Sequence, residues 1–169
     1  MAQADEFVGF AVDATPGLFR RALMLTNDHH AAEDLVQETL ARMYVQWSRI
    51  NRDQSPVGYA YTTLYRLFVS TRRHRWSTEL PSETLPENHA TFGDVDLRLD
   101  LTNALGMLAP KERCVVVARY LDDFSVAEVA AFMVRTPAWV RTTSLRALRR
   151  LREHPALQRH DADLIPKGK

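Results

Sequence analysis

Apolar residues recur at helical spacing along almost the whole chain. In the first half, one stripe runs from Leu18 to Leu25, and a second runs from Ala32 to Trp47 with apolar side chains three or four positions apart. Between them, Thr26-Asn27-Asp28 predicts a turn in which Asp28 caps the following helix. A third stripe follows Pro56 and continues to Phe68. We therefore expect three helices here.

The stretch from Ser77 to Asp96 interrupts this pattern. It contains two prolines, five acidic residues and no lysine or arginine, which is typical of a linker. Helical periodicity resumes at Leu97 and continues, with a break at Ala109-Pro110, to Leu121. Val115 to Val117 could form a short strand by propensity, but its place inside a helical pattern favours a helix.

The sequence thus predicts an all-α fold of two small helical domains joined by an acidic flexible linker. The predicted boundaries are residues 1–76 for the first domain, 77–96 for the linker, 97–155 for the second domain and 156–169 for a frayed tail.

Two helix starts lie close together in the second domain. Ser125 and Glu128 form the pattern of a capping box, and Thr136-Pro137 combines an N-cap with proline at the first helical position. A short helix, a turn and a longer helix have the size and order of a helix-turn-helix unit, whose second helix enters the DNA major groove. The apolar seam expected on that longer helix consists of Val140, Leu145, Leu148 and Leu151.

This longer helix is strongly basic. From Arg135 to Arg152 there are six arginines and no acidic residue. Arginine can bind guanine through two hydrogen bonds, and threonine can contact phosphate or a thymine methyl group. A solvated basic helix packed on its neighbour is the alternative, but the two capped starts favour DNA binding. The early positions expected to be exposed are Ala138, Trp139, Arg141, Thr142 and Thr143.

The first domain has two further surfaces of interest. Glu33 and Gln37, and likewise Asp34 and Glu38, are neighbours one helical turn apart and form an acidic and amide face, which is most often simply solvated. The predicted third helix interleaves aromatic residues with arginines, a pattern that suits single-stranded nucleic acid. Its residues of this kind are Tyr59, Tyr61, Tyr65, Phe68, Arg72, Arg73, Arg75 and Trp76, of which Tyr61 and Phe68 are expected in the core.

Composition narrows the class of protein. The 169 residues are 46% hydrophobic and 25% charged, as in globular proteins, with no membrane span or secretion signal, so we expect a cytoplasmic protein. The only cysteine, Cys114, excludes an internal disulfide and a cysteine zinc knuckle. The net charge of +1 hides segments of opposite sign. Nineteen of the 22 basic residues are arginine, which DNA binding or genomic base composition could equally explain.

Catalysis is not indicated. The six histidines show no metal-ligand spacing such as HExxH, and His29 and His30 read as turn residues. Six glycines form no phosphate-binding loop. We therefore expect no enzyme activity, no cofactor and no metal site.

Several segments together resemble a known family. Ala32-Glu33-Asp34-Leu35-Val36-Gln37-Glu38-Thr39 is similar to the most recognisable motif of the extracytoplasmic-function (ECF, group 4) sigma factors of bacterial RNA polymerase. The segments from Leu108 to Arg113, Arg119 to Leu121 and Ser125 to Ala130 resemble their region 4. The resemblance spans Phe7 to Arg152, and the segment from Arg141 to Leu148 resembles the actinobacterial SigE-like subgroup.

The resemblance implies a dissociable initiation factor without catalytic activity. Such a factor joins core RNA polymerase through the β′ clamp helices and the β subunit, recognises the −10 and −35 promoter elements and assists melting, and an anti-sigma factor can mask it. Residues 77–96 would thread toward the active-site and RNA-exit channel. The implied polymerase-binding residues are Asp34, Gln37 and Glu38. The implied −10 residues are Tyr65, Arg66, Arg72, Arg73, Arg75 and Trp76. The implied −35 residues are Arg135, Thr136, Trp139, Arg141, Thr142, Thr143 and Arg146.

Three positions depart from the family pattern. Family members usually have asparagine at Arg66, glycine at Val134 and a Gly-Thr pair at Ala138-Trp139. A β-branched residue resists positive φ, so the turn at Val134 must take another geometry or carry strain.

Two other functions are compatible with the sequence. The chain could be a stand-alone helix-turn-helix regulator that binds duplex operators without polymerase, with residues 1–76 as an effector or partner domain. Alternatively, it could have kept the fold and act as a decoy or anti-activator, because Trp139 is bulky for a residue facing the DNA groove.

Overall fold

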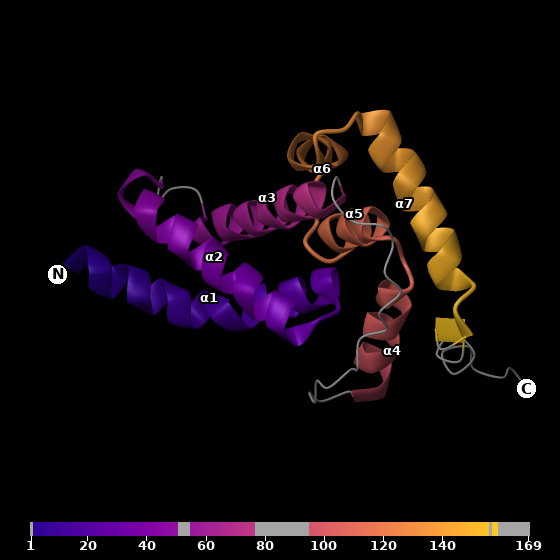
Figure 1. Cartoon of the computed structure of the whole chain (residues 1–169), viewed down its shortest axis with the longest axis horizontal. Helices are drawn as coiled ribbons and strands as arrows, with labels where there is room; N and C mark the ends of the chain where they lie inside the picture. The colour runs from indigo at the N-terminus through magenta and orange to yellow at the C-terminus, as the bar shows by residue number, and fades with distance from the viewer. Residues whose placement is uncertain (1, 51–54, 77–94, 156, 159–169) are drawn as a thin grey trace, which may run out of the picture. The chain divides into compact units, whose positions relative to one another are not determined.

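The computed structural model describes residues 2–50, 55–76, 95–155 and 157–158, with the side chains of residues 72–76 and 95–99 left out of that description. The described residues form seven α-helices, one short 3-10 helix and no strand, which confirms the all-α prediction (Figure 1). None of the described helices is both long and apolar enough to cross a membrane. The predicted linker up to residue 94 and the tail from residue 159 lie outside the described residues. The chain divides into two compact units, Met1–Pro86 and Glu87–Lys169.

Three long helices build the first unit. They are α1 (Ala2–Thr26), α2 (His29–Gln46) and α3 (Pro56–Trp76), with the short 3-10 helix η1 (Trp47–Arg49) after α2. Each long helix packs against the other two. The largest fully buried side chains of their shared core are Leu18, Leu25, Met43, Leu64 and Tyr65. All three helices follow the apolar stripes of the sequence.

The turn between α1 and α2 is built from local polar chemistry. Asn27 adopts a left-handed conformation with φ of 56°, which asparagine tolerates better than most residues. The carboxylate of Asp28 accepts a hydrogen bond of 2.7 Å from the backbone N–H of Ala31. The predicted N-cap of α2 is therefore confirmed.

An aromatic cluster joins the start of α1 to the end of α2. The ring centroids of Phe7 and Phe10 lie 5.1 Å and 5.0 Å from that of Trp47, and Phe7 also lies 5.1 Å from Tyr44. Trp47 is buried by these contacts. They explain why α1 begins at Ala2, far ahead of the first apolar stripe of the sequence.

Four helices build the second unit. They are α4 (Val95–Gly106), α5 (Pro110–Tyr120), α6 (Val126–Met133) and α7 (Pro137–Arg152). Helices α5, α6 and α7 all pack against one another. Val115 to Val117 lies within α5, so the helical interpretation of this run is confirmed. Cys114 is completely buried in the same helix, and its burial raises the pKa of the thiol.

The buried side chain of Arg113 in α5 forms hydrogen bonds to the end of α4. Its Nε donates a hydrogen bond of 2.8 Å to the carbonyl of Leu105, and one terminal nitrogen donates to the carbonyls of Gly106 (3.0 Å) and Leu108 (3.2 Å). Carbonyls at the C-terminal end of a helix lack intrahelical hydrogen-bond donors and carry partial negative charge. The guanidinium of Arg113 supplies the missing donors and an opposite charge. Sequence analysis did not identify this role.

A second buried charge connects α5 to α7. Oε2 of Glu112 accepts a hydrogen bond of 2.8 Å from Arg150 and one of 3.3 Å from the backbone N–H of Ala109. Glu112 is only 6% exposed, so this pairing satisfies a carboxylate that would be costly to bury alone. The start of α5 and the last turns of α7 are held together by this ion pair.

The helix-turn-helix predicted from the sequence consists of α6 and α7, and its caps are confirmed. The backbone N–H of Ser125 donates to Glu128 Oε2 at 2.7 Å, and the backbone N–H of Glu128 donates to Ser125 Oγ at 3.2 Å. These contacts with the hydroxyl and backbone of Ser125 lower the pKa of the Glu128 carboxyl. At α7, Thr136 Oγ1 accepts a hydrogen bond of 3.2 Å from the N–H of Trp139.

The turn between α6 and α7 is strained at Val134. This residue has φ of 53° and ψ of 53°, a left-handed conformation that costs a β-branched side chain about 1–2 kcal/mol. The following N–H, of Arg135, donates to the carbonyl of Ala130 at 3.0 Å, so the turn satisfies the last carbonyls of α6. Of the two outcomes expected at Val134, the structure shows strain.

We expect Val134→Gly to stabilise the protein. Glycine removes the cost of the left-handed conformation but makes the unfolded chain more flexible, so the net gain in the free energy of unfolding should be about 0.5–1 kcal/mol. Urea unfolding monitored by circular dichroism measures it. The matched control is Val45→Gly, at another exposed valine in the right-handed helix α2, which should destabilise the protein. A Val134→Gly protein no more stable than wild type would contradict strain at this turn.

Candidate nucleic-acid interface

The outward face of α7 differs from the one that its apolar residues suggest. The buried face contains Val140, Thr143, Ser144, Ala147 and Leu151. Leu145, expected in the apolar seam, is 68% exposed. Thr143, expected to face DNA, is only 4% exposed, because it lies one turn from both Val140 and Ala147 on the packed face. Both predicted exposures are wrong for one reason: α7 is rotated about its own axis relative to the orientation that the apolar seam predicted, which turns Thr143 inward and Leu145 outward.

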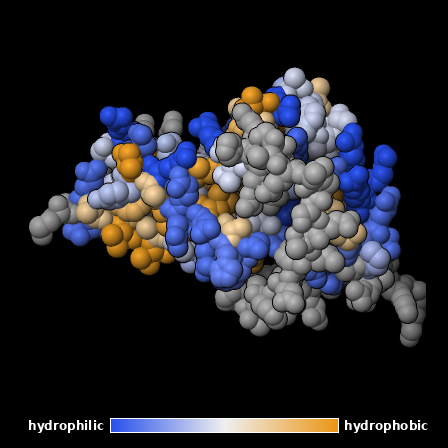
Figure 2. All heavy atoms as spheres, viewed as in Figure 1, coloured by the Kyte–Doolittle hydropathy of each residue, from blue (hydrophilic) through white to orange (hydrophobic). Residues whose placement is uncertain are grey.

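The exposed face of α7 is nevertheless basic and polar. Arg141, Thr142 and Arg146 all lie on it, as predicted, and they surround the exposed Leu145. Figure 2 shows hydrophilic side chains along this helix. Among the described residues, neither Arg141 nor Arg146 forms an ion pair, whereas Arg150 is held by Glu112. Their guanidinium groups are therefore available for phosphate or base edges.

Residues at the N-terminal end of α7 make contacts with one another. The guanidinium of Arg135 stacks over the Trp139 ring, 5.6 Å from its centroid, so each restrains the other. The hydroxyl of Thr136 is exposed, but it accepts the capping hydrogen bond of the helix. Thr136 thus has a structural role in addition to any contact with DNA.

The polar face of α2 is exposed as the sequence suggests. Asp34, Gln37 and Glu38, which we call the acidic ridge, all lie at the surface, opposite the buried Leu35 and Val36. Glu38 forms an ion pair with Arg42 at 2.7 Å. Asp34 and Gln37 make no side-chain hydrogen bond or ion pair among the described residues, so the ridge offers a carboxylate and an amide to a partner.

Tyr65 lies in the core of the first unit and not at its surface. It is fully buried, whereas the predicted contact with −10 DNA requires an exposed side chain. Arg66, the next residue, is exposed. The side chains of Arg72, Arg73, Arg75 and Trp76 lie outside the described residues, although the α3 backbone extends through them.

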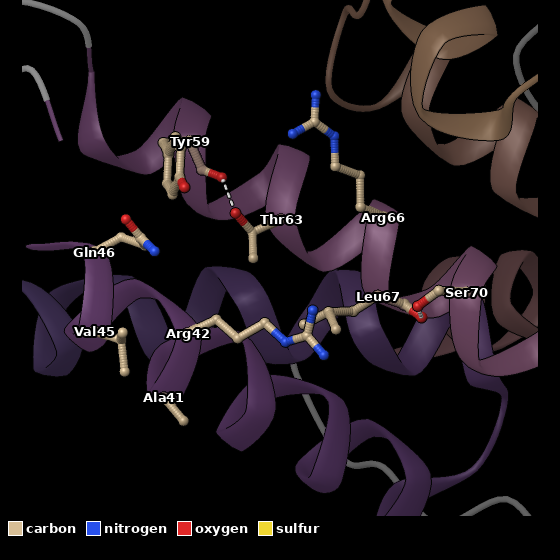
Figure 3. Close-up of a pocket in the computed structure, with 9 residues that line it drawn as sticks. All are labelled: Ala41, Arg42, Val45, Gln46, Tyr59, Thr63, Arg66, Leu67 and Ser70. Carbon is tan, nitrogen blue, oxygen red and sulfur yellow. Dashed lines mark hydrogen bonds between the residues drawn. The ribbon is translucent and has the colours of Figure 1, made fainter. Parts of the chain in front are cut away.

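Arg66 lines a groove between α2 and α3 with a volume of about 520 Å³ (Figure 3). Arg42 and Val45 line it from α2, and Tyr59 and Thr63 line it from α3. Tyr59 is 42% exposed. Arg42 is paired with Glu38, whereas the Arg66 guanidinium extends away from α2 (Figure 3). An exposed arginine and an exposed aromatic ring along one groove suit a nucleotide, whose phosphate and base they can bind.

Sequence analysis identified Arg66 but missed the groove. The residues from α3 that form it, Tyr59, Thr63, Arg66 and Ser70, recur at helical spacing, so the same periodicity that revealed the core could have revealed this polar stripe.

Comparisons with known proteins match both units. The family model for sigma-70 region 2 matches residues 13–78, and that for sigma-70 region 4 matches residues 98–151. The RNA polymerase sigma-E factor of Streptomyces coelicolor is 36% identical, over 99% of this chain and 96% of its own length. The ECF RNA polymerase sigma factor SigL of Mycobacterium tuberculosis is 29% identical over 80% of each chain.

A solved structure is also similar. It is the sigma factor RpoE in complex with the anti-sigma factor NepR from Bartonella quintana, with a TM-score of 0.68 and 26% sequence identity. The similarity covers 90% of this chain and 97% of that one.

Proposed function

This chain belongs to the ECF sigma factors of the sigma-70 family, and we propose that it is a promoter-recognition subunit that binds core RNA polymerase, selects promoters by their −10 and −35 elements and helps to open the DNA. The observation that carries this function is the presence of both sigma-70 regions in one chain, together with a sigma-factor relative aligned over almost its full length. The similarity to Streptomyces sigma-E factors supports placement in the SigE-like subgroup.

A stand-alone regulator accounts for less of the molecule. It would use α6 and α7 on duplex DNA, but it gives no reason for a sigma-70 region 2 over residues 13–78. Linking two small recognition units through polymerase gives affinity that neither has alone. We therefore favour a factor that recognises promoters only as part of the polymerase.

Reconstituted transcription tests this function directly. Core polymerase from an actinobacterium, mixed with the purified chain and a pool of genomic fragments, should produce discrete transcripts that neither component produces alone. Promoters selected from a randomised pool by this holoenzyme should share two conserved elements at fixed spacing. Sequence-specific duplex binding by the chain alone, with no transcription on adding polymerase, would establish the regulator instead.

We assign the acidic ridge of α2 to the polymerase, at the β′ clamp helices. Its support is the combination of exposure, negative charge and a location in the region 2 match, in a protein whose candidate DNA-binding helix α7 is basic. An acidic surface repels DNA, so its partner should be a basic protein surface.

Charge reversal at Asp34 should weaken the holoenzyme. Asp34→Lys places like charges together and should raise the dissociation constant for core polymerase about ten- to hundredfold, which corresponds to about 1–3 kcal/mol. Fluorescence anisotropy of the labelled chain titrated with core polymerase measures it. The control is Asp13→Lys, the same change at an exposed site of α1 outside the ridge. Equal losses in both variants would show that only net charge matters and would remove the ridge from the interface.

For the −35 element, we propose that α7 reads duplex DNA through Arg141, Thr142 and Arg146. Their exposure and their place on one face support this role. Leu145 lies among them and adds an apolar surface suited to a thymine methyl group. Thr143 is replaced in this proposal by Leu145, because it is buried.

Arg141→Ala should reduce promoter discrimination. If the guanidinium binds a base edge through two hydrogen bonds, its loss should cost about 1–3 kcal/mol and relax preference at one −35 position. Holoenzyme selection from a pool randomised at −35 measures both effects. Arg152→Ala, in the last turn of the same helix, should keep the sequence preference. A uniform loss across all sequences in Arg141→Ala would indicate a phosphate contact instead.

For the −10 element, the groove between α2 and α3 is our candidate for an unpaired base. The exposed Arg66 can bind its phosphate, and the exposed Tyr59 ring can stack on its base. The α3 backbone continues into an arginine-rich segment, Arg72 to Arg75, whose side chains lie outside the described residues.

We also propose an anti-sigma factor among the partners and the cytoplasm as the site of action. The similar Bartonella quintana sigma factor was solved in complex with an anti-sigma factor. A sigma factor acts together with RNA polymerase on promoter DNA, and both are in the bacterial cytoplasm. An anti-sigma factor that covers the acidic ridge would prevent polymerase binding.

A further inference from the structure

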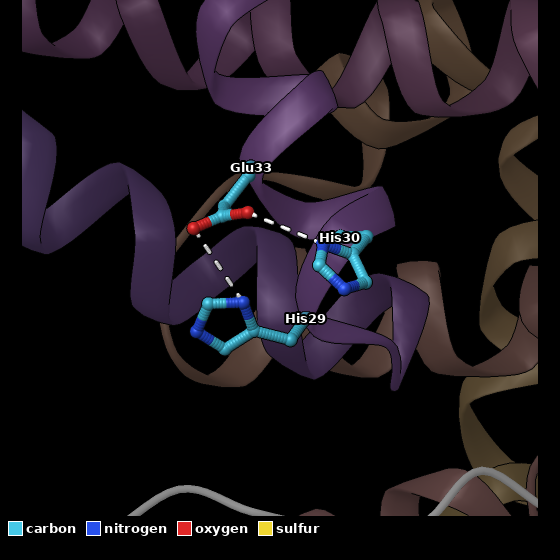
Figure 4. A group of neighbouring side chains, drawn as sticks. All are labelled: His29, His30 and Glu33. Atoms are coloured by element: carbon cyan, nitrogen blue, oxygen red, sulfur yellow. Dashed lines mark ion pairs between the residues drawn. The ribbon is translucent and has the colours of Figure 1, made fainter.

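Three side chains at the start of α2 converge on one point of the surface. Nδ1 of His29 lies 3.5 Å from Glu33 Oε1, and Nδ1 of His30 lies 3.5 Å from Glu33 Oε2 (Figure 4). One potential ligand atom from each residue lies within 4.8 Å of the other two. Sequence analysis interpreted both histidines as turn residues, but the structure brings them together with a carboxylate.

The convergence follows from the helical position of these residues. His29 and His30 are the first residues of α2, and Glu33 is four positions after one and three after the other, so all three share a face. The Asp28 cap fixes this first turn through its hydrogen bond to Ala31. The ring of His29 also packs against Phe19 of α1, with centroids 5.1 Å apart. This contact orients the imidazole before any ligand arrives.

The distances are close to those of a metal site. In tetrahedral coordination with bonds of ~2.0–2.2 Å, ligand atoms lie ~3.3–3.6 Å apart. Each imidazole Nδ1 lies 3.5 Å from a different oxygen of Glu33, and one ligand atom from each residue lies within 4.8 Å of the other two, so small side-chain rotations would bring all three around one ion. Two imidazoles and one carboxylate are the ligands that zinc accepts in sites with an open fourth position. Magnesium and calcium prefer oxygen ligands alone.

We propose that His29, His30 and Glu33 form a binding site for Zn²⁺ or a similar transition-metal dication. The positive end of the α2 dipole opposes a cation at this position. The carboxylate of the N-cap Asp28 and that of Glu33, in the second turn of the helix, offset that effect. The three side chains are accessible to solvent, so the ion can exchange, and water can complete its coordination.

The site is one helical turn from the acidic ridge. Glu33 precedes Gln37 by four positions, so a bound dication would lie beside the surface that we assign to polymerase. The metal site itself does not depend on that assignment, because metal binding is measured on the isolated chain.

Calorimetric titration of the full chain, with any affinity tag removed, tests the proposal. Zn²⁺ should bind the wild type with one saturable site, and Mg²⁺ should not bind there. Glu33→Gln and the double variant His29→Ala/His30→Ala should each weaken zinc binding by at least about tenfold. Asp34→Asn, which removes a neighbouring carboxylate outside the cluster, should leave the affinity unchanged.

Two results would overturn the proposal. One is the absence of saturable zinc binding to the wild type. The other is wild-type affinity in the double histidine variant, since the ion would then be bound elsewhere in the chain. Circular dichroism of each variant confirms that α2 is intact. Substitution with Co²⁺ provides a second readout, because visible absorption typical of nitrogen and oxygen ligands should appear in the wild type and disappear in Glu33→Gln.

Discussion

The rotation of α7 about its own axis decides which of its side chains a partner can meet. Val140, Ser144 and Ala147 turn toward α5 and α6, and the last two are small enough to let the helices approach closely. Burying this face fixes the opposite one, because residues on a helix have fixed angular positions. The ion pair between Arg150 and Glu112 acts near the far end of the helix. The composition of the exposed face is thus a consequence of packing.

The second unit relies on buried charges to hold its small core together. A domain of this size buries limited apolar surface, so polar contacts between helices carry more of its specificity. Arg113 binds the carbonyls at the end of α4, and Glu112 binds α7, although the two residues are adjacent in α5. A single turn of α5 therefore connects the helix before it with the helix that follows the turn at Val134.

Local features of this fold could be predicted from the sequence, and features that depend on packing could not. The caps at Asp28, Ser125 and Thr136 follow from residues a few positions apart. By contrast, α7 carries two overlapping apolar stripes, and only contact with α5 and α6 selects the one that includes Thr143 over the one that includes Leu145. The burial of Tyr65 could not be predicted for the same reason, because periodicity alone did not show that its ring points inward. The cluster of His29, His30 and Glu33 was missed because its spacing differs from that of the HExxH motif.

Cys114 lies at the centre of this arrangement, and its position has a chemical consequence. It is the only thiol in the chain, it is fully enclosed within α5, and burial disfavours the thiolate that reacts with oxidants. The one cysteine of this sequence is therefore not accessible to oxidants in the folded second unit. An oxidant can reach this thiol only when α5 separates from the helices that cover it, so the reactivity of Cys114 reports on opening of the second unit.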